Sequence, residues 1–169
     1  MTLIDAIRLL VFPSLMAFAA SSDLLTMTIS NRISLALVAG FLALAAASGM
    51  NLHDIGMHFL AGGIVLVLTF ICYARGWVGG GDAKLASATA LWFGFEHVWD
   101  YLLWASLLGG VLTLLIMRFR QLPLPYALGR HAWIARLHDR DNGVPYGIAL
   151  ALAALTIYPY TEWMKAAGF

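Results

Sequence analysis

The sequence of 169 residues has few charged side chains. Only 11% of them are Asp, Glu, Lys or Arg, whereas about a quarter is typical of soluble domains, and 62% are apolar. A soluble domain of this length could not bury so much apolar surface. The composition therefore predicts a single membrane-embedded domain, residues 1–169, whose solvent is the lipid bilayer.

Other absences exclude several functional classes. The net charge is +1, so the chain lacks the basic footprint of a nucleic-acid-binding protein. Cys72 is the single cysteine, which excludes an intramolecular disulfide and a cysteine-rich zinc module. Neither the G-x-S-x-G motif of serine hydrolases nor the H-E-x-x-H motif of zinc peptidases occurs. His53 and His58 are spaced at i and i+5 and do not share a helical face, so we expect no metal and no cofactor.

Long apolar runs dominate what remains. A helix needs on the order of 20 apolar residues to cross about 30 Å of hydrocarbon. Backbone polar groups cannot stay unpaired in lipid, so such runs should be helices. The sequence predicts an all-α polytopic membrane protein with six spans, of which the fourth is the weakest. The spans are at about 4–21, 33–50, 56–74, 84–99, 101–117 and 144–160.

The first run could also be a cleaved signal peptide. However, Asp5 and Arg8 lie inside its first two turns, and no basic segment precedes it. We therefore expect the first run to be a retained helix.

The basic residues predict the orientation. Eight of the ten fall after the first, third and fifth predicted spans: Arg32, Arg75, Lys84, Arg118, Arg120, Arg130, Arg136 and Arg140. The opposite side has only Arg8 and Lys165. Because cytoplasmic loops carry the excess of Lys and Arg, both termini should lie outside the cytoplasm and the glycine-rich stretch should face it.

The one long cytoplasmic loop, residues 118–143, allows two interpretations. Leu128, Trp133, Ile134 and Leu137 could form the apolar stripe of a short helix lying at the membrane interface. The alternative is a solvated basic loop that only sets the topology.

Two of the nine acidic residues need an explanation. The other seven lie at outer helix ends or in the charged loop, whereas Asp23 and Asp82 both lie at span ends on the predicted cytoplasmic face. Asp82 could simply be a helix N-cap, and Asp23 could pair with Arg32 or cap a turn. A cap does not need the three glycines 79–81, which suit a backbone that passes close to another chain.

Two such carboxyl groups suit aspartic proteolysis. Two close carboxyls cannot both ionise, so they share one proton. The charged group then draws a proton from water, while the neutral group donates to the peptide carbonyl. Lys84 could tune the charge of the pair, bind a lipid phosphate or extend its amine to the interface.

Three motifs carry a resemblance to a known family. Residues 79–85, GGGDAKL, resemble the G-x-G-D-x-K-L signature of type IV prepilin peptidases, which are G-x-G-D intramembrane aspartyl proteases. The family's first catalytic Asp precedes an Ile-Pro-Asn, and here Asp23 precedes residues 29–31, Ile-Ser-Asn, with Ser in place of Pro. Residues 144–147, VPYG, are similar to the family's Pro-Phe-Gly or Pro-Tyr-Gly before the last helix.

The resemblance implies a set of site residues. Asp23 and Asp82 would be catalytic. The motif and active-site backbone would include Gly79, Gly81 and Lys84, and the residues shaping the substrate cleft would be Asn31, Pro145, Tyr146 and Gly147.

The resemblance also implies a location and partners. The protein would lie in the cytoplasmic (inner) membrane and cleave the basic leader from a prepilin or pseudopilin at the cytoplasmic face. It is similar to the small stand-alone peptidases of Flp (tight-adherence) pilus systems, and archaeal preflagellin peptidases are a related possibility. Pilus or secretion machinery would be its partner. The chain lacks the cysteine-bearing insertion of larger members, so N-methyltransferase activity is not expected.

Two rival functions are compatible with the composition. A small proton-coupled transporter would also carry intramembrane acids, and a non-enzymatic assembly subunit would use Asp82 only as a cap. Both key acids sit toward one face instead of at mid-depth, and no inverted repeat is visible. The peptidase interpretation is therefore preferred.

Overall fold

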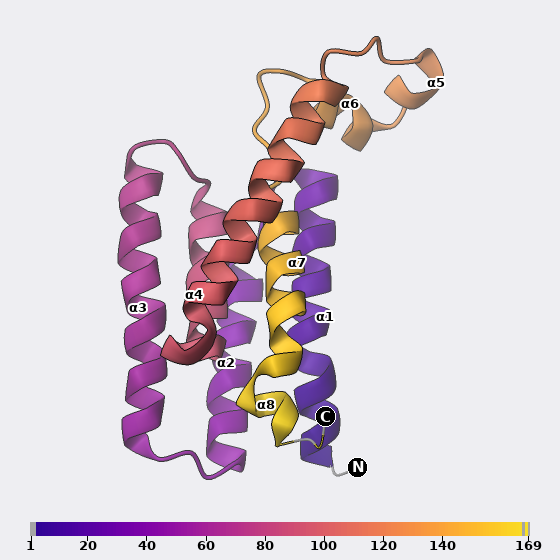
Figure 1. Cartoon of the computed structure of the whole chain (residues 1–169). Coiled ribbons are helices and arrows are strands. Elements are labelled where there is room, and N and C mark those ends of the chain that lie inside the picture. The colour runs from indigo at the N-terminus through magenta and orange to yellow at the C-terminus, as the bar shows by residue number, and fades with distance from the viewer. Residues whose placement is uncertain (1–2, 167, 169) are drawn as a thin grey trace.

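The computed structural model describes residues 3–166 and 168, and the described residues form helices and no strand. The prediction of an all-α fold is confirmed. Five long helices make up a bundle (Figure 1): α1 (Leu3–Thr26), α2 (Asn31–Ala47), α3 (Leu52–Ala74), α4 (Gly80–Phe119) and α7 (Gly147–Ile157). The short elements are α5 (Tyr126–Gly129), α6 (Ala132–His138), the 3-10 helix η1 (Tyr158–Tyr160) and α8 (Glu162–Lys165).

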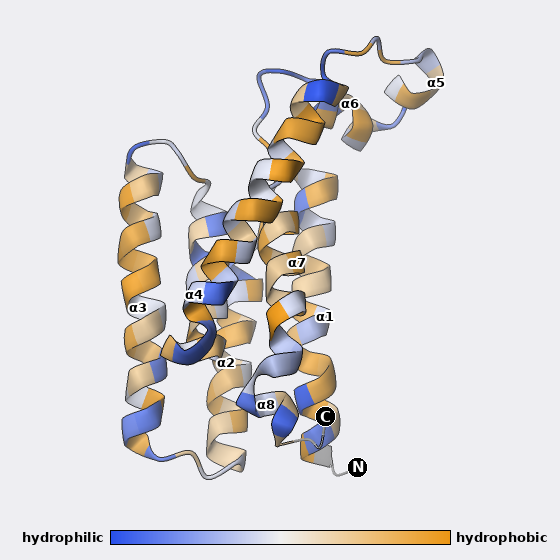
Figure 2. Ribbon diagram, viewed as in Figure 1, coloured by the Kyte–Doolittle hydropathy of each residue, from blue (hydrophilic) through white to orange (hydrophobic). Residues whose placement is uncertain are grey.

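Within the described residues, three helices are long and apolar enough to cross a bilayer: Ile4–Thr26, Leu52–Ala74 and Gly80–Phe119. Two further apolar helices, Asn31–Ala47 and Gly147–Tyr160, are shorter. Figure 2 shows apolar residues along most of the length of the helices, and hydrophilic residues at the lower end of α3, at the upper end of α4 and at the turn within α4. This distribution is that of a membrane protein, and the count of six spans stays a prediction.

Helix α4 is not one straight rod. Its 40 residues would extend about 60 Å, twice the hydrocarbon thickness of about 30 Å. The backbone instead leaves the helical conformation at Gly94, with φ 58° and ψ −166°, and the chain turns back (Figure 1). We call residues 80–93 the first arm of α4 and residues 95–119 the second arm.

The turn at Gly94 corrects two predicted boundaries. The sequence placed a break between spans 84–99 and 101–117, near Asp100, whereas the structure places it earlier. The conformation of Gly94 lies in a region of backbone space that is essentially restricted to glycine. The first arm therefore ends at this residue, and the polar residues from Glu96 to Asp100 belong to the second arm.

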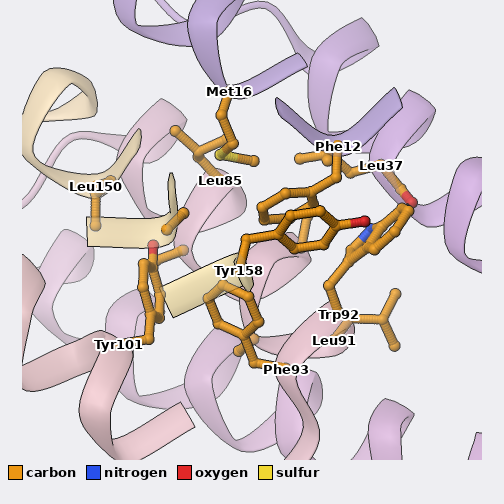
Figure 3. Packing of buried hydrophobic residues seen from close by; sticks show 14 of the residues in the cluster. Phe12, Met16, Leu37, Leu85, Leu91, Trp92, Phe93, Tyr101, Leu150 and Tyr158 are labelled. Atoms are coloured by element: carbon orange, nitrogen blue, oxygen red, sulfur yellow. The ribbon is translucent and has the colours of Figure 1, made fainter. Parts of the chain in front are cut away.

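Aromatic residues hold the bundle together near the turn at Gly94. Trp92 is 1% exposed and donates its indole N–H to the Leu37 carbonyl at 2.9 Å. Its ring packs 5.0 Å from that of Phe12, which stacks on Tyr158 at 4.4 Å (Figure 3). These contacts join α1, α2, the first arm of α4 and η1. They hold these helices in position relative to one another along the bundle.

The two ends of the bundle carry different segments. Both chain ends lie at one end, and the loop between α3 and α4 lies at the other, together with α5 and α6 (Figure 1). This arrangement is the one that the distribution of basic residues predicts. Which end faces the cytoplasm stays a prediction.

The loop at 118–143 contains a short helix, but not the predicted stripe. Trp133, Ile134 and Leu137 are half-buried on α6, whereas Leu128 lies on α5 and is exposed. Leu128 does not belong to the stripe because residues 130–131 separate the two helices.

Basic side chains attach this loop to the bundle. Arg120 donates to the Leu137 carbonyl at 2.8 Å, and Arg136 donates to the Leu25 carbonyl at 2.8 Å. These two hydrogen bonds tie α6 to the ends of α4 and α1, so the basic residues also have a structural role there.

Replacement of Gly94 by Ala should destabilise the fold. An added Cβ would lie 2.9 Å from Cε1 of His58, whose ring is held by the Leu91 carbonyl at 2.7 Å, and the backbone would be strained. We expect the free energy of unfolding to fall by roughly 1–3 kcal/mol. Thermal unfolding in detergent measures this loss.

Gly56→Ala is the matched control, because a Cβ at Gly56 meets no atom within 4 Å. It should be neutral or stabilising, since Ala favours a helix over Gly by about 1 kcal/mol. Equal stability of the two variants would contradict the assignment of the turn to Gly94.

Candidate active site

Two acidic residues from distant parts of the sequence line one cavity. Asp23 lies in the last turns of α1 and is 5% exposed, and Asp82 lies in the first turn of α4 and is partly buried. The cavity has a volume of about 240 Å³. Its other lining residues come from the loop after α1 and the start of α4: Met27, Thr28, Ile29, Gly79, Gly80 and Gly81. The two carboxyl groups are close enough for their charges to interact.

The end of α1 shapes one wall of this cavity. Met27 takes a left-handed conformation, with φ 55°, and its N–H donates to the Asp23 carbonyl at 2.8 Å. The Ser22 hydroxyl donates to the Thr28 carbonyl at 2.9 Å. These two bonds end the helix and direct the following loop across the cavity toward α4.

The Asp23 carboxylate is held by the backbone of α7. The Gly147 N–H donates to Oδ2 of Asp23 at 2.7 Å. A Cβ on residue 147 would lie 2.7 Å from Cδ1 of Ile29 and 2.8 Å from Oδ2 of Asp23. Only glycine therefore allows this hydrogen bond. The ion pairs of the described residues do not include Asp23 with Arg32.

Asp82 is not the N-cap residue that one interpretation of the sequence suggested. Gly79 is the N-cap of α4, and Asp82 is the third residue of the helix, where the positive end of the helix dipole favours an anion. The Gly79 backbone bonds the Asp82 carboxylate, as in a capping box. Oδ1 of Asp82 is buried and has no hydrogen-bond partner among the described residues. One oxygen thus has a capping role, and the other is enclosed by the surrounding residues without a hydrogen bond to them.

The glycines before Asp82 bring segments of the same chain together. A Cβ on Gly81 would lie 3.1 Å from Cβ of Ile29, and a Cβ on Gly80 would lie 3.2 Å from the Tyr73 ring. The glycines thus allow a close approach within this chain, and the approach to another chain stays a prediction. The segment that packs against Gly81 is the loop after α1, which leads from Asp23 past Asp82.

Asn31 and Lys84 lie beside the carboxylate cavity. The Lys84 amine donates to Oδ1 of Asn31 at 2.8 Å, and both side chains are exposed. The N-cap of α2 is Ser30, whose hydroxyl accepts from the Arg32 N–H at 3.3 Å. The Ser that stands where the resembling family has Pro is therefore a helix cap.

The segment before α7 is wedged between α1 and the second arm of α4. Pro145 is fully buried, and the Tyr146 hydroxyl donates to the Ala105 carbonyl at 3.1 Å. The Tyr146 ring packs directly on Gly109. The sequence motif pointed to these residues only as part of a cleft. Pro145 and Tyr146 hold Gly147 in place, and Gly147 in turn holds Asp23. The side-chain pattern of the sequence does not predict this role, because the donor is a backbone amide.

The arrangement can activate water. Two acidic residues line a space large enough for several water molecules, each of which occupies about 30 Å³ in the liquid. No three His, Cys, Asp or Glu side chains within residues 3–166 group as metal ligands would. The chemistry available from these side chains is general acid–base catalysis.

Comparison with known proteins identifies one family. The model of the type IV leader peptidase family matches residues 10–114. The matched region contains Asp23 and Asp82 and ends before α7, so Gly147 lies outside it. Neither a curated protein nor a solved structure matches the chain.

Replacement of Gly109 by Ala should loosen the wedge at Tyr146. The added Cβ would overlap the Tyr146 ring and hydroxyl, so the tyrosine and the start of α7 must shift. Overpacking of this kind costs about 1–3 kcal/mol of unfolding free energy, which thermal unfolding measures. Gly110→Ala is the control, because a Cβ there meets no atom within 4 Å. If both variants unfold at the same temperature, the wedge does not contribute to stability.

Proposed function

The chain belongs to the type IV leader peptidase family, and from this premise we propose that it is an intramembrane aspartic endopeptidase whose catalytic residues are Asp23 and Asp82. The observation that carries the proposal is their convergence. The end of α1 and the start of α4 place both carboxyl groups in one cavity at the same end of the bundle. Family membership alone supports a peptidase, and the paired carboxyls supply the aspartic mechanism.

In the proposed reaction the two carboxyl groups share one proton. Like charges this close oppose a second ionisation, so one group stays neutral while the other accepts a proton from a water molecule. The water attacks the peptide carbonyl carbon, and the neutral carboxyl donates its proton to the carbonyl oxygen. Collapse of the tetrahedral intermediate then breaks the C–N bond as the leaving amine gains a proton.

The proposed substrate is the leader junction of a type IV prepilin, a pseudopilin or a preflagellin. Among these substrates we propose a Flp-type prepilin, because the sequence resembles the small stand-alone peptidases of Flp pilus systems. The cavity lies at the bundle end that also carries the Arg-rich loop 118–143. By the distribution of basic residues this end faces the cytoplasm, where a basic leader would remain. Transport is less well supported, because the carboxyl pair lies at a helix end and not at mid-depth.

Conversion of either carboxyl to an amide should abolish cleavage. Asp23→Asn and Asp82→Asn preserve the side-chain shape but remove the shared proton, so we expect the rate to fall by about 10²-fold or more. The assay is leader removal from a Flp-type prepilin in membranes, followed by gel mobility. Asp100→Asn, an exposed acid on the second arm of α4, is the control and should cleave normally. Leader processing by both Asn variants at the normal rate would falsify the aspartic mechanism.

Replacement of Gly147 by Ala should lower kcat with little change in KM. The added methyl group would displace Asp23 or Ile29 and break the hydrogen bond that fixes the carboxylate. A misplaced catalytic group typically costs about 10²-fold in rate. Gly143→Ala in the same loop meets no atom within 4 Å and is the control. A change in KM alone would instead assign Gly147 to substrate binding.

A further inference from the structure

A second, largely apolar depression lies next to the carboxylate cavity. It has a volume of about 500 Å³ and lies between α2, α3 and the first arm of α4. Helices α2 and α3 both pack on α4, and they meet each other where the Phe41 ring packs 5.1 Å from that of His58 and 6.0 Å from that of Phe59, which closes one end of the depression. We call this depression the lateral groove. Leu35 and Leu66 on its two walls are exposed.

Gly63 marks space for a further helix. Its neighbour Gly62 is required by packing, because a Cβ there would lie 3.2 Å from both Cβ of Leu91 and the Ser87 carbonyl oxygen. Gly63 lines the lateral groove, yet a Cβ on it would meet no atom within 4 Å. Nothing in the described part of the chain requires a glycine at this position. In membranes, small residues allow a neighbouring helix to approach closely.

The polar end of the groove adjoins the proposed catalytic site. Asn31 and Lys84 line the groove there and are bonded to each other at 2.8 Å. Lys84 follows Asp82 by two residues, and Asn31 follows Ile29 of the carboxylate cavity by two residues. The groove and the cavity share no lining residue, but the start of α4 and the segment 29–31 contribute residues to both. Lys84 takes part in no ion pair among the described residues, so its charge is available to an occupant.

We propose that the lateral groove seats the apolar helix that follows the scissile bond of the substrate. The helix would lie against Gly63 between α2 and α3, and Lys84 would bind an acceptor group in its first turn, most simply a carboxylate. Because the start of α4 lines both the groove and the cavity, the residues before this helix would then lie near Asp23 and Asp82. This inference rests on the proposed peptidase function and names how that function selects its substrate.

The test fills the groove and compares two substrates. Gly63→Leu places a side chain in open space, so the fold can accept it. Gly56→Leu is the matched control, because Gly56 lies seven residues earlier on the same face of α3, is equally open and does not line the groove. One substrate is a Flp-type prepilin with its apolar helix. The other is a peptide of the leader and scissile bond without that helix.

We expect Gly63→Leu to raise KM for the helix-bearing prepilin by about tenfold or more, and to cleave the short peptide as wild type does. Gly56→Leu should match wild type on both. Equal behaviour of the two variants on the prepilin overturns the proposal. An equal loss on both substrates also overturns it, and would indicate a lipid or a second copy of the chain in the groove.

A crosslinking arm separates this proposal from the proposed function. With Cys72 replaced by Ser and Asp82 by Asn, Gly63→Cys should form a disulfide with a cysteine placed in the apolar helix of the prepilin, and Gly56→Cys should not. This readout needs no cleavage. Crosslinking without cleavage by wild type would reject the peptidase and keep the groove, whereas cleavage without crosslinking at Gly63 would reject the groove alone.

Discussion

The hydrogen bond from the Gly147 amide to Asp23 determines how the ends of the helices must be arranged. A buried carboxylate without a partner is costly, so Asp23 can be buried only where a donor meets it. The donor comes from the start of α7, far away in the sequence. It can approach only because residue 147 has no side chain and the loop at Ile29 lies beside it. The start of α7 is therefore part of the candidate site, although it lies outside the region that the family model matches.

The position of this donor depends in turn on Gly94, which lies partway along the bundle toward the end that carries α8 (Figure 1). Gly94 reverses α4, and only a reversed α4 can send its second arm back alongside α7. That arm supplies the Ala105 carbonyl and the flat surface of Gly109 on which Tyr146 rests. A glycine partway along the bundle and a carboxylate at its far end are thus connected through one helix.

The sequence predicts the helices and the pairing of the acids for physical reasons. Lipid requires every backbone group to be bonded within its own segment, so apolar runs can be read as helices. Asp23 and Asp82 follow an odd number of predicted spans each, which places them at one end of the bundle. The turn at Gly94 could not be predicted, because the polar residues from Glu96 to Asp100 resemble a later loop. The role of the Gly147 amide could not be predicted either, because a pattern of side chains does not show where a backbone amide donates.

The two carboxyl groups have different environments, and we expect different roles for them in the proposed reaction. Asp23 has a fixed amide on one oxygen and is confined by Ile29 and the start of α7, so it has little freedom to move. Asp82 uses one oxygen at the helix start and leaves Oδ1 buried without a partner. A buried oxygen without a hydrogen bond is costly, and the cost is larger when the group is charged. Asp23 is therefore the rigid member of the proposed pair, and Asp82 is the member whose second oxygen must become exposed before a water or a substrate carbonyl can bind to it.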